Sequence, residues 1–314
     1  MFAADGKHLL FWSKGDLWIT SLAGGDVHCL TCGLANDPSP GTALANMATP
    51  FPDGKRVFIE LDSQVGTAGM EVLECHSSVV HCRSRRLVPV DYSDAEAAVI
   101  PPGGAVSTQQ IGLNVAAHAQ LSQDGRYVGF SEARSDAIKA MIVGKLQRGR
   151  GKYVVTDARV INPPGPTSST DPSVKAWSDS SALFELKTFT DGGRDVTYVE
   201  GGGASLDHTT AWSVNLATGN RTLLAWAPDW DEDNGVSPNG KLLSLYSQRT
   251  MHYVDWIGRL LPVRSFIDAP LSTMGSNLGG DTECMGPMWL LPSSGDDQGK
   301  LMGEPLVDYR YPGV

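Results

Sequence analysis

The stretch FPDGKRVFI at residues 51–59 shows the pattern that decides the fold of this chain. Its Asp-Gly pair supplies the positive φ that a tight hairpin turn needs, and the residues that follow read as an apolar strand. The same plan recurs as AADGKHLLF at 3–11, SQDGRYVGF at 122–130, SDSSALFEL at 178–186 and SPNGKLLSL at 237–245. The chain is therefore built from repeats that each read as strand, turn, strand.

A second element follows these copies, in which a strand leads through a glycine turn into another strand. A tryptophan marks it in DLWITSLAGGDVHCLT at 16–31, AWSVNLATGNRTLLA at 211–225 and MWLLPSSGDDQGKLMG at 288–303. EVLECHSSVVHCRSRRLV at 71–88 and AMIVGKLQRGRGKYVV at 140–155 fill the same place without it. Each repeat then holds four antiparallel strands, as a propeller blade does. We expect Trp18, Trp212 and Trp289, at equivalent positions, to pack between blades.

The Asp-Gly-Lys turn, the strand after it and the later Trp and Gly resemble the WD40-like (PD40) repeats of TolB-like β-propellers over nearly the whole chain. The resemblance implies an all-β β-propeller of four-stranded antiparallel blades. We expect a single domain over residues 1–314. Its five legible blades cover about 1–34, 40–92, 110–162, 173–226 and 230–308.

The first repeat begins almost at its turn, so the inner strand of that blade is missing or nearly so. We expect five or six blades. Either PLVDYRYPGV at the C-terminus closes the first blade, or the chain is a fragment of a larger propeller. Members of the resembled family act as periplasmic interaction modules, as propeller domains of serine peptidases and as carbohydrate-processing enzymes. The resemblance therefore implies a scaffold and leaves the reaction open.

Composition limits the partners. The 314 residues have a net charge of −10 and a pI near 5.1, and the longest basic cluster is RSRR at 83–86, which argues against nucleic acid. No apolar stretch reaches the roughly 18 residues that span a bilayer, so we expect no transmembrane segment. The chain enters a patterned strand within eight residues, as if a signal segment or another earlier segment had been removed. A protein or a glycan remains as the partner.

Four of the five cysteines come in two close pairs, Cys29 with Cys32 and Cys75 with Cys82. Disulfides within these pairs favour an extracytoplasmic location, secreted or periplasmic, because such compartments are oxidising. A zinc site of the same four cysteines, with His28, His76 and His81 nearby, is the alternative, although the spacing is not that of two zinc knuckles. Cys284 is left over.

The repeat register predicts where a ligand binds. Loops that enter the innermost strands of a propeller surround its channel, and counting back from the turns places His118 and Asp233 there, with Met47 and Val174 at the equivalent positions. The last two repeats also contain the longest insertions, and long loops on a rigid scaffold often bind ligands. The insertions add the candidate ligand-binding residues Asp207, His208, Arg249, His252, Asp255 and Trp256.

The acidic stretch DWDEDNGVSPNG at 229–240 raises the question of a metal site. An EF-hand needs Gly at position 6 and Glu at position 12, and this stretch has Asn234 and Gly240 there. The register instead makes it the loop that enters the inner strand of the fifth blade. Asp229, Asp231 and Asp233 are then weak candidates for a divalent cation, the one cofactor that the sequence suggests.

Sequence motifs of catalysis are missing: there is no GxSxG, P-loop or HExxH. Two hypotheses remain. One is a noncatalytic scaffold that binds a protein or a glycan at the channel mouth. The other is a carbohydrate-active lyase or hydrolase that uses carboxylates among 229–233, including Glu232, with His118 or His252.

Overall fold

A computed structural model describes residues 1–34, 47–61, 69–93, 116–134, 137–162, 183–201, 209–226, 231–237, 239–247, 249 and 288–306. They form nineteen strands and two short 3-10 helices, η1 (Val79–His81) and η2 (Asp191–Gly193), in two compact units, Met1–Asn162 and Pro163–Val314. Within these ranges, no helix has both the length and the apolar character to cross a membrane.

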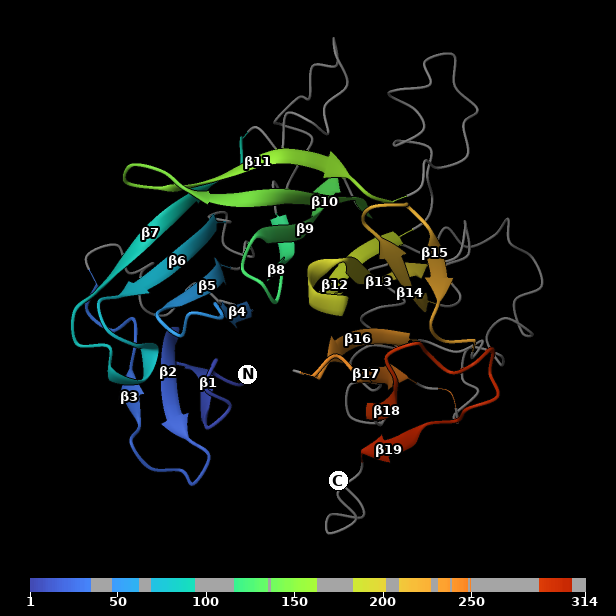
Figure 1. Ribbon diagram of the computed structural model, residues 1–314, viewed down its shortest axis with the longest axis horizontal. Coiled ribbons are helices and arrows are strands. Elements are labelled where there is room, and N and C mark those ends of the chain that lie inside the picture. The colour runs from blue at the N-terminus through green and yellow to red at the C-terminus, as the bar shows by residue number, and fades with distance from the viewer. Residues whose placement is uncertain are drawn as a thin grey trace. The chain divides into compact units, whose positions relative to one another are not determined.

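The first unit begins with a three-stranded antiparallel sheet in the order β1-β2-β3 (Figure 1). Its strands are β1 (His8–Ser13), β2 (Asp16–Ser21) and β3 (His28–Cys29). Phe2 forms an isolated antiparallel bridge with Leu9 of β1. This bridge lies where the other sheets have a complete first strand.

Two four-stranded meanders follow and merge into one sheet, ordered β4-β5-β6-β7-β11-β10-β9-β8. The merger is a short parallel pairing of the two outer strands, in which Tyr153 faces Val90 and Val154 faces Asp91. The strands are β4 (Met47–Pro50), β5 (Arg56–Leu61), β6 (Gly69–Cys75), β7 (Arg85–Asp91), β8 (Ala116–Leu121), β9 (Tyr127–Arg134), β10 (Ala137–Arg148) and β11 (Tyr153–Val160).

The second unit holds two further antiparallel sheets, β12-β13-β14-β15 and β16-β17-β18-β19, each with its strands in chain order. Their strands are β12 (Leu183–Thr190), β13 (Asp195–Gly201), β14 (Thr209–Asn215), β15 (Arg221–Leu223), β16 (Asp231–Val236), β17 (Leu242–Ser247), β18 (Met288–Pro292) and β19 (Glu304–Leu306).

Five successive antiparallel meanders, four of four strands and one of three, are the blade architecture of a β-propeller. The fold class expected from the repeats is therefore confirmed. That the five meanders form one domain over residues 1–314 stays a prediction.

The turns of the repeat share one hydrogen bond. A side-chain oxygen of the Asp or Asn accepts the backbone N–H two residues later, at 2.9 Å from Asp53 to Lys55, 3.0 Å from Asp124 to Arg126 and 3.1 Å from Asn239 to Lys241. The glycine between them has positive φ, +65° at Gly54. The sequence pattern thus encodes an Asx turn that joins β4 to β5, β8 to β9 and β16 to β17. In the β12–β15 sheet the first two strands are instead joined through η2, and not by the turn expected at Ser180 and Ser181.

One expectation from the register is wrong. Residues 231–236 were expected in a loop, and they form β16, the first strand of the last sheet, with Asp231 opposite Ser247. Met47 and His118 likewise lie in first strands, β4 and β8. The reason is geometric: the first strand runs almost up to the turn, so a position a few residues before the turn is already inside that strand.

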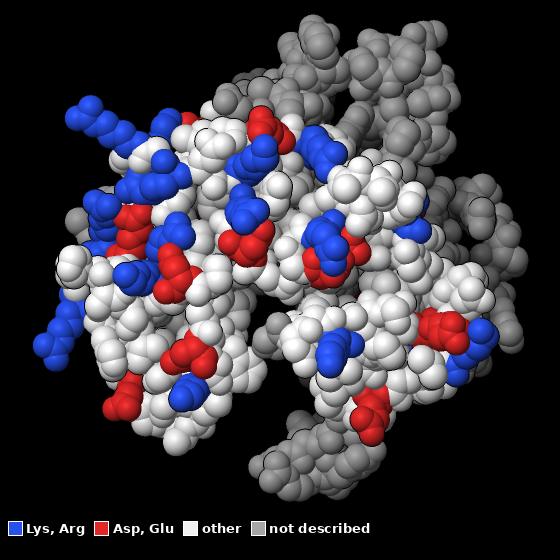
Figure 2. Space-filling view, in the orientation of Figure 1, with Lys and Arg blue, Asp and Glu red and all other residues white. Residues whose placement is uncertain are grey.

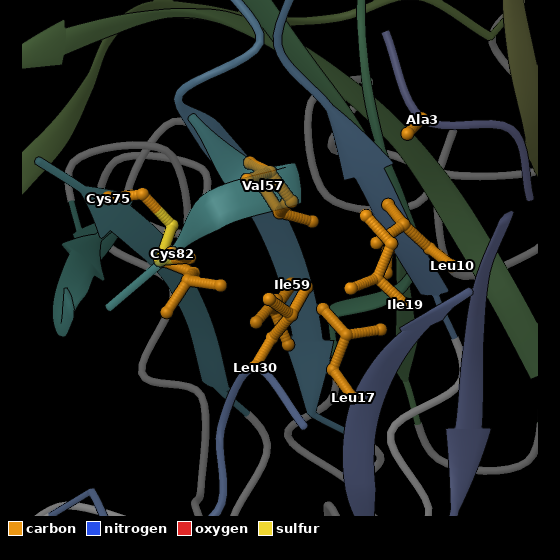
Figure 3. Close-up of a cluster of buried hydrophobic side chains, with 12 residues drawn as sticks. Ala3, Leu10, Leu17, Ile19, Leu30, Val57, Ile59, Cys75 and Cys82 are labelled. Atoms are coloured by element: carbon orange, nitrogen blue, oxygen red, sulfur yellow. A yellow bond between two sulfur atoms is a disulfide. The ribbon is translucent and has the colours of Figure 1, made fainter. Parts of the chain in front are cut away.

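Apolar side chains of the first two sheets form one core cluster in the first unit. Leu17 and Ile19 of β2 lie beside Val57 and Ile59 of β5 in Figure 3, and all four are at most 1% exposed. The disulfide between Cys75 and Cys82 lies at the side of the same cluster. Burial of such a cluster, at about 25 cal/mol per Å² of apolar surface, is the main term that holds the two sheets together.

The repeat tryptophans do not all pack in the core. Trp289 is buried at 5% exposure, whereas Trp18 and Trp212 are half-buried. Arg221 covers the ring of Trp212, with its guanidinium carbon 4.4 Å from the ring centre. The expectation that these tryptophans form a buried core between blades is therefore wrong for Trp18 and Trp212. The indole N–H of Trp18 donates to the carbonyl of Ser13, and that of Trp212 donates to Thr210 Oγ1.

Candidate binding site

A cavity of about 390 Å³ lies in the first unit, where three connecting segments meet. The segment before β1 contributes Asp5, and β1 contributes His8. The β4–β5 turn contributes Asp53 and Lys55. The connection from β6 to β7 contributes residues 77–81, which include η1. Turn chemistry therefore brings ionisable side chains from two neighbouring repeats to one place.

The wall formed by η1 is fixed to the rest of the site. The backbone N–H of Val79 donates to the carbonyl of Gly54 at 2.8 Å, which attaches η1 to the β4–β5 turn. The N–H of Cys75 donates to the carbonyl of Lys55 at 2.9 Å. A disulfide between Cys75 and Cys82 closes the connection on both sides of η1. The cavity is thus built by covalent and backbone bonds.

Asp5 and His8 form the most defined side-chain pair of the cavity. Asp5 Oδ2 lies 2.7 Å from His8 Nδ1, while Asp5 Oδ1 accepts the N–H of Lys7 at 2.9 Å. The N–H of Lys7 lowers the pKa of Asp5, so its carboxylate is ionised at neutral pH. An ionised carboxylate makes Nδ1 the donor of the pair. Nε2 is then the ring nitrogen that can accept a hydrogen bond from a ligand.

Lys55 supplies a positive charge at the opposite turn. The Asp53 carboxylate accepts hydrogen bonds from the backbone N–H of Lys55 and, at 2.7 Å, from Nε of Arg56. The charge of Asp53 is therefore neutralised by Arg56. Among the residues that the structure describes, the Lys55 ammonium forms no ion pair, and its side chain is exposed. It is available to an anionic or strongly polar group of a ligand.

The two serines of the cavity are engaged in local bonds. Ser77 Oγ donates to the carbonyl of His81 at 3.0 Å, and Ser78 Oγ accepts the N–H of His81 at 3.2 Å as the cap of η1. A nucleophilic serine has to give its proton to a base. Because Ser77 gives its proton to a carbonyl, the arrangement does not form a Ser-His-Asp triad.

His118, which the sequence predicted in a loop at the channel mouth, lies in strand β8. His118 has φ +56° and lies at a register shift between Ala117 and Gln120. A left-handed conformation at a residue other than glycine is uncommon and often occurs at functional positions. His118 does not line the cavity described above.

Two other predicted residues lie in the second unit. Asp231 is fully buried at the start of β16. Arg249 is 5% exposed, and its Nε donates to Ser247 Oγ at 3.0 Å while a terminal nitrogen donates to the carbonyl of Met302 at 3.1 Å. The bonds of Arg249 therefore connect β17 with the chain before β19. Its binding role stays a prediction.

The remaining predicted binding and metal residues lie outside what the structure describes. The backbone of Asp233 belongs to β16, but its side chain is not described. The other residues are Asp207, His208, Asp229, His252, Asp255 and Trp256. The convergence of His118 with Asp233, and a divalent cation at Asp229, Asp231 and Asp233, stay predictions.

The cysteine pairs occur as disulfides in the structure, Cys29 with Cys32 and Cys75 with Cys82. Asp16 lies close to the first pair, with its oxygen and the two sulfurs within 4.8 Å of one another. Sulfur in a disulfide is not the thiolate that binds zinc. The zinc alternative is therefore wrong in this structure. Cys284 lies outside the described residues.

Sequence reasoning missed the cavity residues Asp5, His8, Lys55 and Ser77. The repeat alignment contained a usable signal, since Asp5 and Asp53 occupy the same turn position and His8 and Arg56 each follow three residues later. Both acidic residues pair with that third residue, at 2.7 Å in each case. That neighbouring turns meet around a cavity is visible only in three dimensions.

The fold and the cavity together define a β-propeller-class protein with a mainly apolar cavity, bordered by a few ionisable side chains, between its first two sheets. No family model and no curated protein matches the chain. Among solved structures, a TolB described as putative from Agrobacterium tumefaciens is similar over 78% of this chain and 68% of its own, with 16% identity and a TM-score of 0.44.

Two further structures show the same level of similarity. TolB from Acinetobacter baumannii shares 9% identity over 77% of this chain, with a TM-score of 0.45. The periplasmic gluconolactonase of Pseudomonas aeruginosa shares 14% over 79%, with a TM-score of 0.42. The match covers 47% of the Acinetobacter TolB and 62% of the gluconolactonase, so the chain spans about half to two thirds of these proteins.

Proposed function

We propose that this protein is an extracytoplasmic binding scaffold that holds a polar segment of a protein or glycan partner in the cavity between its first two sheets. The observation that supports the proposal is the fixed cavity itself. Its walls are bonded by Val79 to Gly54 and by the Cys75–Cys82 disulfide, while His8 and Lys55 present polar groups to it. Pre-formed sites with a few polar groups are typical of ligand binding.

The proposed location rests on the disulfides. Two disulfides in one compact unit are expected in an oxidising compartment and are rare in a reducing cytosol. We therefore place the protein in a periplasm or outside the cell.

The test is a screen of glycans and peptides on the purified chain, followed by titration of a hit against two matched variants. Lys55→Ala removes the cavity cation, and Lys241→Ala removes the lysine at the same turn position of the last repeat. We expect at least a tenfold weaker affinity for Lys55→Ala and an unchanged affinity for Lys241→Ala. Equal affinities of the two variants would exclude the cavity as the binding site.

The second candidate is a carbohydrate-active lyase or hydrolase, and the Asp5–His8 contact of 2.7 Å is the observation that favours it. A carboxylate that orients a histidine is the arrangement of a general base. The measurement is product release from a panel of polysaccharides by the wild type and by His8→Ala. Release that disappears in His8→Ala would replace the scaffold proposal with the enzyme.

A further inference from the structure

The outer edge of the first unit concentrates positive charge in a chain whose net charge is −10. Two arginine-rich turns meet there, RSRR at 83–86 and RGRGK at 148–152, because the strands after them, β7 and β11, are hydrogen-bonded neighbours. We name this surface the basic edge. It consists of the exposed side chains of Arg83, Arg86, Arg148, Arg150 and Lys152. In Figure 2 blue side chains gather at the left, where Figure 1 shows β7 and the tip of the β10–β11 hairpin.

Two carboxylates organise the basic edge without neutralising it. Glu74 accepts from Arg86 and from Arg148, each at 2.7 Å. Asp91 accepts from Lys152 at 2.6 Å. Five cations against these two anions leave an excess of three positive charges, and neither Arg83 nor Arg150 has an ion-pair partner among the described residues.

The arginines next to Glu74 are held in place before any partner arrives. The guanidinium carbon of Arg148 lies 5.0 Å from the ring centre of Tyr153, and the Tyr153 hydroxyl donates to Glu74 at 2.8 Å. Arg148 also donates to the carbonyl of Lys152 at 3.1 Å, which fixes the hairpin tip. Positioned guanidinium groups can bind two oxygens of a sulfate or carboxylate group at once and lose little entropy when they do so.

The chemistry of the surface separates the kinds of partner. A protein interface needs an apolar or aromatic centre. The exposed large hydrophobic residues of the described chain all lie elsewhere, and none falls within 83–91 or 145–160. A surface of exposed cations without apolar anchors suits a polyanion that binds through ion pairs. Acidic polysaccharides are polyanions of the extracytoplasmic location proposed above, and a linear one can reach both arginine-rich turns along the edge.

We propose that the basic edge binds a linear anionic polysaccharide through its sulfate or carboxylate groups. The site is separate from the cavity between the first two sheets and shares no residue with it. The proposal therefore takes the extracytoplasmic location from the proposed function and does not depend on ligand binding in the cavity.

The test measures binding of a fluorescent heparin oligosaccharide and of an oligogalacturonate to the full chain over a range of NaCl concentrations. Arg83→Ala/Arg150→Ala removes the two cations that have no carboxylate partner, so the ion pairs that support the fold are kept. We expect it to weaken binding of at least one oligosaccharide at least tenfold and to lower the salt dependence, since fewer ion pairs form. Arg194→Ala/Lys300→Ala removes two exposed cations of the second unit and is expected to change the affinity less than twofold.

Three results would overturn the proposal. The first is equal binding of the oligosaccharides by the two double variants, and the second is no binding by the wild type. The last concerns three other polyanions: phosphatidylglycerol vesicles, an oligonucleotide of equal charge and a polyglutamate peptide. If the wild type binds any of them at least as tightly as it binds the oligosaccharides, the surface recognises charge on another class of molecule.

Discussion

Gly144 shows how one residue allows two strands to approach each other. A Cβ added at Gly144 of β10 would lie 2.4 Å from Val155 Cγ1 and 3.1 Å from the carbonyl oxygen of Thr156. The pairing of β10 with β11 shifts register at this point, between Val143 and Lys145. A glycine in a strand at a bulge or a close backbone approach is the expected solution to this crowding.

Replacement of this glycine tests the close approach. Gly144→Ala is expected to lower the free energy of unfolding by about 2 kcal/mol, because Val155 and the backbone of β11 have to move. Gly149→Ala is the control, since its nearest neighbour is 3.4 Å away, and it should cost less than about 1 kcal/mol. Urea unfolding followed by tryptophan fluorescence measures both, and equal values would contradict the crowding.

Glu74 is the residue on which the strands of the basic edge converge. It lies at β6 and binds Arg86 of β7, Arg148 of β10 and Tyr153 of β11. Burial would raise its pKa, but the hydrogen bonds from Arg148, Tyr153 and Arg86 outweigh it and lower the pKa of Glu74 to about 2. The carboxylate is thus charged under all ordinary conditions.

Loss of this charge should be measurable. Glu74→Gln is expected to lower the free energy of unfolding by about 1 kcal/mol, the scale of a partly exposed ion-pair network. Glu304→Gln, at an exposed position of β19, is the control and should have no effect within error. A Glu74→Gln variant as stable as the wild type would show that the network only orients the arginines.

At the scale of elements, the connection from β6 to β7 depends on its disulfide. Cys75 ends β6, Cys82 follows η1, and both are buried, at 7% and 4% exposure. The bond joins two cysteines that are seven residues apart in the sequence. It therefore restricts the unfolded chain and also holds one wall of the candidate binding site.

Removal of the bond tests both effects. Cys75→Ala/Cys82→Ala is expected to cost about 2 kcal/mol or more of unfolding free energy, from loop entropy and lost core packing. The double variant should also bind any ligand that contacts Lys55 with lower affinity, because η1 is no longer fixed beside Gly54. Dithiothreitol should lower the unfolding midpoint of the wild type more than that of the variant. Identical midpoints for the two proteins without reductant would contradict a structural role of the bond.

At the scale of the whole molecule, acid should destabilise the fold through Glu74. Its pKa is lowered from an ordinary value of 4.5 to about 2, so the stabilisation is complete above about pH 4.5 and is lost as the pH falls toward 2. Glu200 acts in the opposite sense, because burial raises its pKa and protonation then favours the folded state. Glu74 is therefore one residue through which acid weakens the first unit, and Asp5 and Asp91, whose pKa values are also lowered, act in the same sense.

The measurement is urea unfolding at pH 6 and at pH 3 for the wild type and Glu74→Gln. We expect the wild type to lose more stability between the two pH values than the variant, which has no carboxylate to protonate at this position. If both proteins lose the same amount, the acid dependence originates elsewhere in the chain.

The sequence by itself determined the repeat. The turns at Asp53, Asp124 and Asn239 depend on local sequence, because the Asp or Asn side chain accepts the N–H two residues later and the glycine between them adopts positive φ. The strands that follow them are indicated by short-range alternation of apolar residues. That is why the all-β blade architecture was predictable, and why the cysteines seven residues apart, on either side of η1, were recognised as a pair.

Only the tertiary structure decided where distant turns meet. Nothing local to Asp5 and His8 indicates that Lys55 and Ser77 border the same cavity, since this depends on how the first two sheets pack. Nor does RSRR at 83–86 reveal its neighbour RGRGK at 148–152, because the parallel pairing of β7 and β11 joins strands more than 60 residues apart in the chain. Local hydrogen bonds determine elements, whereas sites arise from long-range packing, which single-sequence patterns do not encode.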